Sequence, residues 1–87
     1  MRYMVIETFP AGARPVYERA RERGRMLPDG LRYVESWVTP DLGRCFQLMD
    51  ADEPGLLAQW TARWDDLASF EIVPVISSAE AAERALR

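Results

Sequence analysis

The stretch Leu31–Asp50, LRYVESWVTPDLGRCFQLMD, decides the fold. Its centre, Thr39–Gly43, has the composition of a turn. Pro40 presets its own φ, Asp41 can bond to the nearby backbone, and Gly43 can adopt φ > 0. The flanks are rich in the β-branched and aromatic residues typical of strands. The sequence therefore predicts an antiparallel hairpin whose turn is centred on Asp41.

This turn predicts which side chains face one another across the hairpin. The pairs expected on one face are Trp37 with Cys45, Glu35 with Gln47, and Tyr33 with Met49. The other face is expected to carry Val34, Ser36, Phe46 and Leu48. Because side chains alternate along a strand, a shift of one residue would redistribute both sets.

The rest of the chain supplies two more strands and two helices around this hairpin. The expected elements are a strand over Arg2–Phe9, a helix over Arg14–Gly24 with Pro15 in its first turn, a helix capped by Asp52 and ending at residues 63–65, and a strand over Phe70–Ile76. Pro74 cannot donate to a ladder, which predicts an edge strand. Ser77 and Glu80 form a capping-box pattern, so residues 77–87 are expected to be a short helix or a frayed tail.

The order strand, helix, strand, strand, helix, strand predicts a ferredoxin-like α+β sandwich over residues 1–76. Its four antiparallel strands are expected in the spatial order last, first, third, second, with both helices on one sheet face. The face expected under the helices carries Met4, Ile6, Val34, Phe46, Leu48 and Ile72. It is expected to meet Val16, Ala20, Leu56, Leu57 and Trp60.

Composition excludes several classes of function. The chain of 87 residues is 48% hydrophobic, carries a net charge of −3 and has a pI of about 4.9, so it is expected to be globular and not to bind nucleic acid. No stretch is long and apolar enough to span a membrane, and Met1–Phe9 does not resemble a signal peptide. A single cysteine cannot form an internal disulfide, which favours the cytoplasm.

The chain contains no histidine, and all 11 basic residues are arginine. This excludes Ser-His-Asp and Cys-His catalysis, histidine-ligated haem or zinc, and lysine Schiff bases. Acid–base chemistry would depend on Glu, Asp, Tyr or Cys45. No ligand spacing supports a metal site, and we expect no cofactor.

The sheet face opposite the helices is expected to carry the candidate site. It would hold three glutamates, the catalytic candidates Glu7, Glu35 and Glu71. The expected ligand-binding set is Glu7, Tyr33, Glu35, Trp37, Cys45, Gln47 and Glu71. This face is too apolar to remain bare, so we expect a second copy to cover it in a homodimer. Carboxylates enclosed there would need partners or raised pKa values, and they could alternatively form only a polar interface or a wet face.

Six blocks of sequence resemble a family of small bacterial proteins classed as a domain of unknown function. They are Val5–Phe9, Gly24–Leu31, Glu35–Trp37, Arg44–Met49, Trp64–Leu67 and Phe70–Val75. The resemblance covers Met1–Ile76 and leaves out the tail. It implies a ferredoxin-like dimer related to the dimeric α/β-barrel group. That group includes cofactor-free monooxygenases, isomerases, haem-handling proteins and small-molecule binders, so fold analogy does not choose a chemistry.

Three functions follow as hypotheses. The first is a homodimer that binds a small molecule on the Glu/Gln/Trp face. The second is a cofactor-free isomerase or monooxygenase-like enzyme with a glutamate as general base. The third is a structural or protein-interaction module. Arg25 and Arg44 are candidates to orient an anionic ligand, or they are ordinary surface charges or partners of a glutamate.

Overall fold

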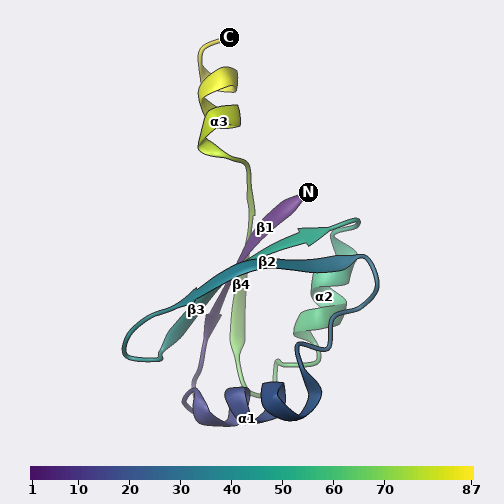
Figure 1. Cartoon of the computed structure of the whole chain (residues 1–87), viewed down its shortest axis with the longest axis vertical. Helices are drawn as coiled ribbons and strands as arrows, with labels where there is room; N and C mark the ends of the chain where they lie inside the picture. Colours follow the sequence, from purple (N-terminus) through teal and green to yellow (C-terminus); the bar gives the residue numbers. More distant parts are fainter.

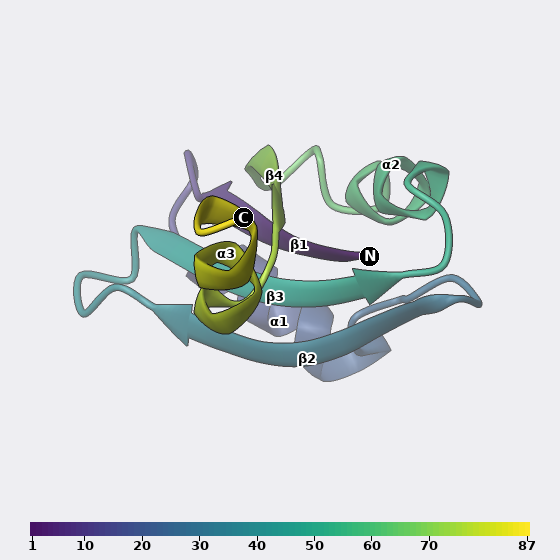
Figure 2. The ribbon, with the colours of Figure 1, turned by 90° about the horizontal axis from the view of Figure 1, so that it is seen from above.

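The computed structural model describes residues 1–87, and it contains four strands and three helices. The elements are β1 (Arg2–Thr8), α1 (Arg14–Arg23), β2 (Leu31–Val38), β3 (Arg44–Ala51), α2 (Gly55–Thr61), β4 (Ser69–Val75) and α3 (Ser78–Ala85). The strands form one antiparallel sheet in the order β2-β3-β1-β4 (Figure 2). This is the predicted ferredoxin-like α+β arrangement, and its strand order is confirmed.

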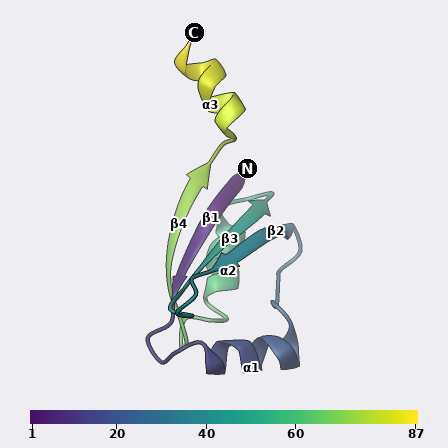
Figure 3. The ribbon, with the colours of Figure 1, turned by 60° about the vertical axis from the view of Figure 1, so that its left-hand side comes forward.

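The three helices occupy different places around the sheet. α1 lies across the lower end of the strands and α2 runs alongside them, whereas α3 stands clear at the opposite end (Figure 1). Figure 3 shows the same separation of α3 from the sheet. No residue of α3 is buried. None of the helices has both the length and the apolar character that a membrane crossing requires.

The central hairpin closes as a tight turn with a left-handed residue. The Leu42 N–H donates to the Thr39 carbonyl at 2.8 Å, and the Gly43 N–H donates to Asp41 Oδ1 at 2.9 Å, which confirms the local role of Asp41. Leu42, not Gly43, takes the positive φ, at 61°. The expectation for Gly43 was wrong because the last residue of the turn over Thr39–Leu42 is itself the left-handed one.

The helix ends agree with the sequence at Gly24 and Ser77 and differ at both ends of α2, which was predicted to end at residues 63–65. Gly24 ends α1 with φ of 67°, and Ser77 Oγ accepts the Glu80 N–H at 3.1 Å as the capping box predicted. Asp52 does not cap α2, which begins only at Gly55 and ends at Thr61. The Asp52 carboxylate accepts from Arg32 at 2.7 Å instead, so it is used to tie the β2 edge to the segment after β3.

The core lies on the sheet face opposite to the one predicted. Val5 and Met49 are fully buried and pack in one cluster with Trp60 of α2. The apolar side chains expected beneath the helices lie on the outer face instead: Met4, Ile6, Phe46 and Leu48. The prediction was wrong because it placed Glu7 and Gln47 on the face that the helices leave uncovered. In the structure the two side chains hydrogen-bond each other, so both are buried.

A β-bulge at Val34 changes which residues of β2 face the helices. Tyr33 pairs with Met49 as predicted, but the register then shifts, and Glu35 pairs with Leu48. Trp37 pairs with Phe46 by the same shift, and it is 54% exposed on the outer face. Ser36 and Val38 turn inward in their place. The extra residue of a bulge reverses the alternation beyond it, so the predicted pairs of Glu35 and Trp37 were wrong.

Strand β4 contributes the remaining correction. It is an edge strand, as Pro74 predicted. Glu71 pairs with Ile6 and therefore faces outward, whereas Phe70 pairs with Glu7 on the helix-covered face. The expectation that Glu71 shares a face with Glu7 was wrong, because antiparallel partners directly opposite each other lie on the same face.

Candidate functional site

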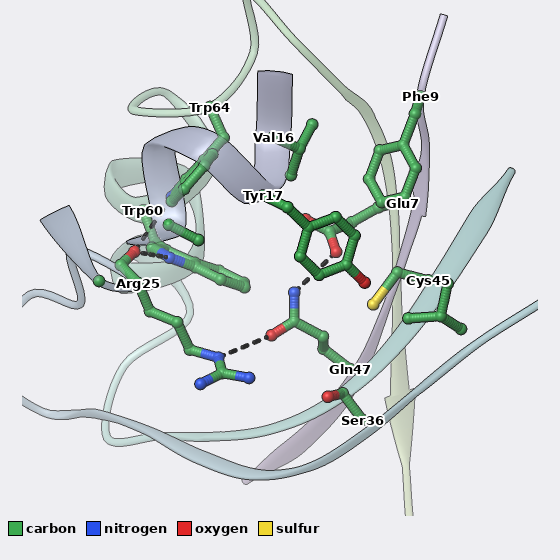
Figure 4. A pocket seen from close by; sticks show the side chains of 13 residues that line it. Glu7, Phe9, Val16, Tyr17, Arg25, Ser36, Cys45, Gln47, Trp60 and Trp64 are labelled. Carbon is green, nitrogen blue, oxygen red and sulfur yellow. Dashed lines mark hydrogen bonds between the residues drawn. The ribbon is translucent and has the colours of Figure 1, made fainter. Parts of the chain in front are cut away.

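A cavity of about 210 Å³ lies between α1 and the sheet and is partly open to solvent; Figure 4 shows the side chains that line it. Its lining comprises Glu7, Phe9, Val16, Tyr17, Ala20, Gly24, Arg25, Ser36, Val38, Cys45, Gln47, Trp60 and Trp64. Helix α1 has no buried residue, and three of its lining residues, Val16, Ala20 and the capping Gly24, have short side chains or none. They cannot fill the space above the sheet, which explains why a cavity exists there.

Glu7 is the only carboxyl group in the lining, and it is 5% exposed. The β1–β3 register places Cys45 directly opposite it and Gln47 diagonally across, within reach of its side chain. Gln47 Nε2 donates to Glu7 Oε2 at 2.7 Å. Burial raises the pKa of Glu7 above its ordinary 4.5, although the hydrogen bonds from Gln47 and Cys45 and the charge of Arg25 oppose this rise. The cavity floor therefore holds a carboxyl group that accepts protons more readily than a solvated glutamate.

Gln47 links this carboxyl group to the only cation of the cavity. Its amide nitrogen serves Glu7, and its Oε1 accepts from Arg25 Nε at 3.3 Å. The Arg25 guanidinium also stacks on the Tyr33 ring, with its carbon 3.5 Å from the ring centroid. Arg25 forms no ion pair, so both of its terminal nitrogens keep their N–H donors free.

The backbone around Arg25 is fixed by side chains that follow it in the chain by 35 or more residues. The Arg25 carbonyl accepts the indole N–H groups of Trp60 and Trp64, at 2.8 and 3.0 Å. Arg63 donates to the next carbonyl, that of Met26. Met26 has φ of 57°, a left-handed conformation that costs about 1–2 kcal/mol in a residue with a side chain. Such strain is retained only where surrounding contacts impose it, and here the side chains of Trp60, Trp64 and Arg63 supply those contacts.

Cys45 and Tyr17 complete the polar part of the cavity. Burial, together with the charge and hydrogen bond of Glu7, raises the pKa of Cys45 to about 12, so the thiol is protonated at neutral pH. The Tyr17 hydroxyl points towards Cys45 (Figure 4). Burial also raises the pKa of Tyr17, and the nearby Cys45 and Glu7 add to this effect. Both groups are therefore neutral hydrogen-bonding partners and not nucleophiles.

The structure brings together four of the seven predicted ligand-binding residues. Glu7, Cys45 and Gln47 line the cavity, and Tyr33 supports Arg25 at its edge. The other three, Glu35, Trp37 and Glu71, lie on the outer sheet face for the reasons given above. Arg44 also lies away from the cavity, where its guanidinium covers the Phe46 ring at 5.0 Å.

Several lining residues were not predicted as part of the site. Tyr17 and Val16 were assigned to the stripe of a helix, and Trp60 and Trp64 to the core. Ser36 was assigned to the wrong face, and its Oγ now lies 2.7 Å from the Tyr33 hydroxyl because the bulge puts both inside. Of the other lining residues, Arg25 was predicted as a candidate to orient an anionic ligand, and Gly24 was predicted only as the end of a helix.

The arrangement can bind and orient a small polar ligand, and it can accept a proton at Glu7. Among the aromatic side chains of the lining, the cavity offers one carboxyl group, one cation and one amide that contacts both. The structure brings together no group of three or more His, Cys, Asp or Glu side chains that could hold a metal ion.

Comparison with known proteins places the chain in a family. Neither the comparison with curated proteins nor that with solved structures found a match. A family model described as a domain of unknown function, DUF3303, matches residues 1–87. The match includes residues 77–87, which the resemblance noted in the sequence had left out. The chain therefore belongs to this family of domains of unknown function.

Proposed function

We propose that this protein binds a small molecule in the cavity between α1 and the sheet. The observation that carries the proposal is a buried carboxyl group, Glu7, at the floor of a cavity that is open to solvent and otherwise largely apolar. A buried carboxyl group costs stability unless it is paired, and Gln47 is a neutral partner that leaves its charge uncompensated. Perturbed ionisable groups of this kind cluster at functional sites.

The dimensions of the cavity restrict the ligand. An engineered apolar cavity of about 150 Å³ holds benzene, so about 210 Å³ accommodates one ring with a short substituent. Phe9, Tyr17, Trp60 and Trp64 supply aromatic faces for such a ring. The cavity is smaller than the roughly 300–1,000 Å³ of pockets for drug-sized ligands.

A screen of single-ring compounds by ¹H–¹⁵N NMR tests the proposal. Ligands of the cavity shift the indole signals of Trp60 and Trp64 and leave the indole of Trp37 on the outer face unchanged. Ala20→Leu fills the cavity from α1 and abolishes these shifts. Ala58→Leu, the same change at an exposed position of α2, preserves them. A screen in which no compound moves either indole would refute the proposal.

An enzymatic role for the same cavity is the second candidate, and the raised pKa of Glu7 favours it. A general base works best when its pKa approaches the operating pH, and Glu7 is shifted in that direction. Abstraction of a proton from carbon next to a carbonyl group, as in a cofactor-free isomerase or monooxygenase, would use Glu7 as base. Titration of Glu7 by NMR is the check, because a pKa at or below 4.5 would remove the support for a base.

A homodimer remains part of the proposal, now through the outer sheet face. That face presents seven apolar side chains, Met4, Ile6, Trp37, Phe46, Leu48, Val73 and Val75. No helix of the same chain covers them, and exposed apolar patches of this kind mark interaction sites. We expect light scattering to give the mass of two chains, and Phe46→Glu to reduce it to one. Glu18→Gln on α1 is the control for a change of charge elsewhere. A monomer at all concentrations would contradict the dimer and leave the cavity unaffected.

A further inference from the structure

The two polar ends of the cavity differ in the hydrogen bonds they can make. Gln47 cannot turn its amide over without losing both partners, since its nitrogen donates to Glu7 and its oxygen accepts from Arg25. The Arg25 end therefore offers only donors and a positive charge, and the Glu7 end offers carboxyl oxygens. The side-chain amide of Gln47 bridges the two ends.

The charge at the Arg25 end is available for a ligand. Arg14, Arg19, Arg32, Arg84 and Arg87 all form ion pairs in this structure. Arg25 is one of the six arginines that form none, and it is the only arginine that lines the cavity; Trp60, Trp64 and Tyr33 hold its backbone and its guanidinium in place. An arginine with free terminal N–H groups in a fixed plane matches the two oxygens of a carboxylate.

The fixed position of Arg25 lowers the cost of using it. Binding a ligand with a mobile arginine requires its rotamers to be ordered at that moment. Here the stacking on Tyr33 and the contact with Gln47 have already ordered the side chain. The strained Met26 and the two indoles keep the preceding backbone in one conformation.

We propose that the ligand of this cavity is a single-ring acid, with its carboxylate on the free N–H groups of Arg25 and a hydroxyl or N–H group donating to Glu7. The ring lies between these ends against the aromatic lining. The charge of the acid is placed at the far end of Gln47 from Glu7, which limits repulsion between the two carboxyl groups. This inference rests on the proposed function, and it adds the class of the ligand.

Matched pairs of probes test the two ends separately on the wild-type chain. Benzoate and its neutral isostere benzamide differ at the acid, and 3-hydroxybenzoate and 3-methoxybenzoate differ in the donor. Dissociation constants come from titrations followed by the indole signals of Trp60 and Trp64. We expect benzoate to bind about tenfold or more tightly than benzamide, because the hydrogen bond is charge-assisted. We expect the hydroxyl compound to bind several-fold more tightly than the methoxy compound.

Two variants assign the preference for the acid to one residue. Arg25→Gln should bring benzoate to the affinity of benzamide, while benzamide itself is little changed. Arg23→Gln is the control, because Arg23 ends the same helix and does not line the cavity. Arg25 holds the two indoles through its main-chain carbonyl, so its side chain can be replaced without removing those bonds.

The outcomes separate this inference from the function on which it rests. If benzamide binds as tightly as benzoate, or if Arg25→Gln retains the preference, the acid class is refuted and the cavity proposal stands. If the methoxy compound matches the hydroxyl compound, the role of Glu7 as acceptor is refuted. If none of the four rings moves either indole but another compound of the screen does, the acid class is refuted and the cavity proposal stands; if no compound of the screen moves either indole, both fail.

Discussion

Replacing Trp60 and Trp64 by phenylalanine tests how the Arg25 loop is held. Both indoles donate to one oxygen, the Arg25 carbonyl, at 2.8 and 3.0 Å. A carbonyl oxygen has two lone pairs, so either donor alone still satisfies it. Each single substitution therefore removes one of two hydrogen bonds and some packing, and we expect a loss of about 0.5–3 kcal/mol in the free energy of unfolding.

The double variant should cost more than the sum of the two. It leaves a partly buried carbonyl without a protein donor, which adds about 1–3 kcal/mol to the separate losses. Direct contact between the two rings acts in the opposite direction. Each single variant already loses that contact, so the double variant would cost less than the sum of the two single variants. The sign of the coupling energy thus distinguishes a shared hydrogen-bond acceptor from simple packing.

Urea denaturation followed by circular dichroism measures all four proteins without relying on tryptophan fluorescence. In a domain whose total stability is about 5–15 kcal/mol, a coupling of 1–3 kcal/mol is readily resolved. Additivity within about 0.5 kcal/mol, or a double variant less costly than the sum, would refute the shared-acceptor argument. The same double variant should lose part of its preference for benzoate over benzamide, because Arg25 is then less firmly placed.

Three further predictions concern single side chains. Because burial raises the pKa of Glu7, the folded protein binds a proton more tightly than the unfolded chain. The stability of wild type relative to Glu7→Gln should therefore rise as pH falls from 7 towards 4.5 and level off below 4.5. Stability curves that stay parallel for the two proteins would contradict this. Cys45, with a pKa of about 12 against an ordinary 9.0, should react with a thiol reagent about a thousandfold more slowly in the folded than in urea-unfolded protein, and equal rates would show that the thiol is not protected. Leu42→Gly should raise the melting temperature by a few degrees, since Leu42 is 54% exposed and holds φ of 61°, whereas Leu42→Ala should not raise it.

The fold could be predicted from the sequence because its signals are local. Three boundaries are set by local preferences of single residues for turns or helix ends. They are the turn around Asp41, the glycine after α1 and the capping box at Ser77. The order of elements then allows few topologies, and the predicted strand order is the one observed. The start of α2 was predicted wrongly because an aspartate can either cap a helix or pair with an arginine. In the structure Asp52 pairs with Arg32 and does not cap α2.

The assignment of the two sheet faces could not be read from the sequence. Counting apolar residues favours burying the face with Ile6 and Phe46. The structure buries the face with Glu7 and Gln47, whose polarity is hidden because each satisfies the other across two strands. A pair separated by 40 residues leaves no local pattern. The bulge at Val34 has no sequence signal either, because valine is equally typical of a regular strand position.

The reversal of the faces also changes how assembly relates to binding. The sequence predicted one surface that served as both dimer interface and ligand site, so that loss of the dimer would have abolished binding. In the structure the cavity is completed within one chain by α1, and the uncovered apolar side chains lie on the opposite side of the same sheet. A substitution such as Phe46→Glu should therefore separate the copies and leave the affinity for benzoate within about twofold of wild type, because Phe46 does not line the cavity. A monomeric variant that had lost binding would show instead that the partner holds the sheet, and with it Glu7 and Gln47, in the shape the ligand requires.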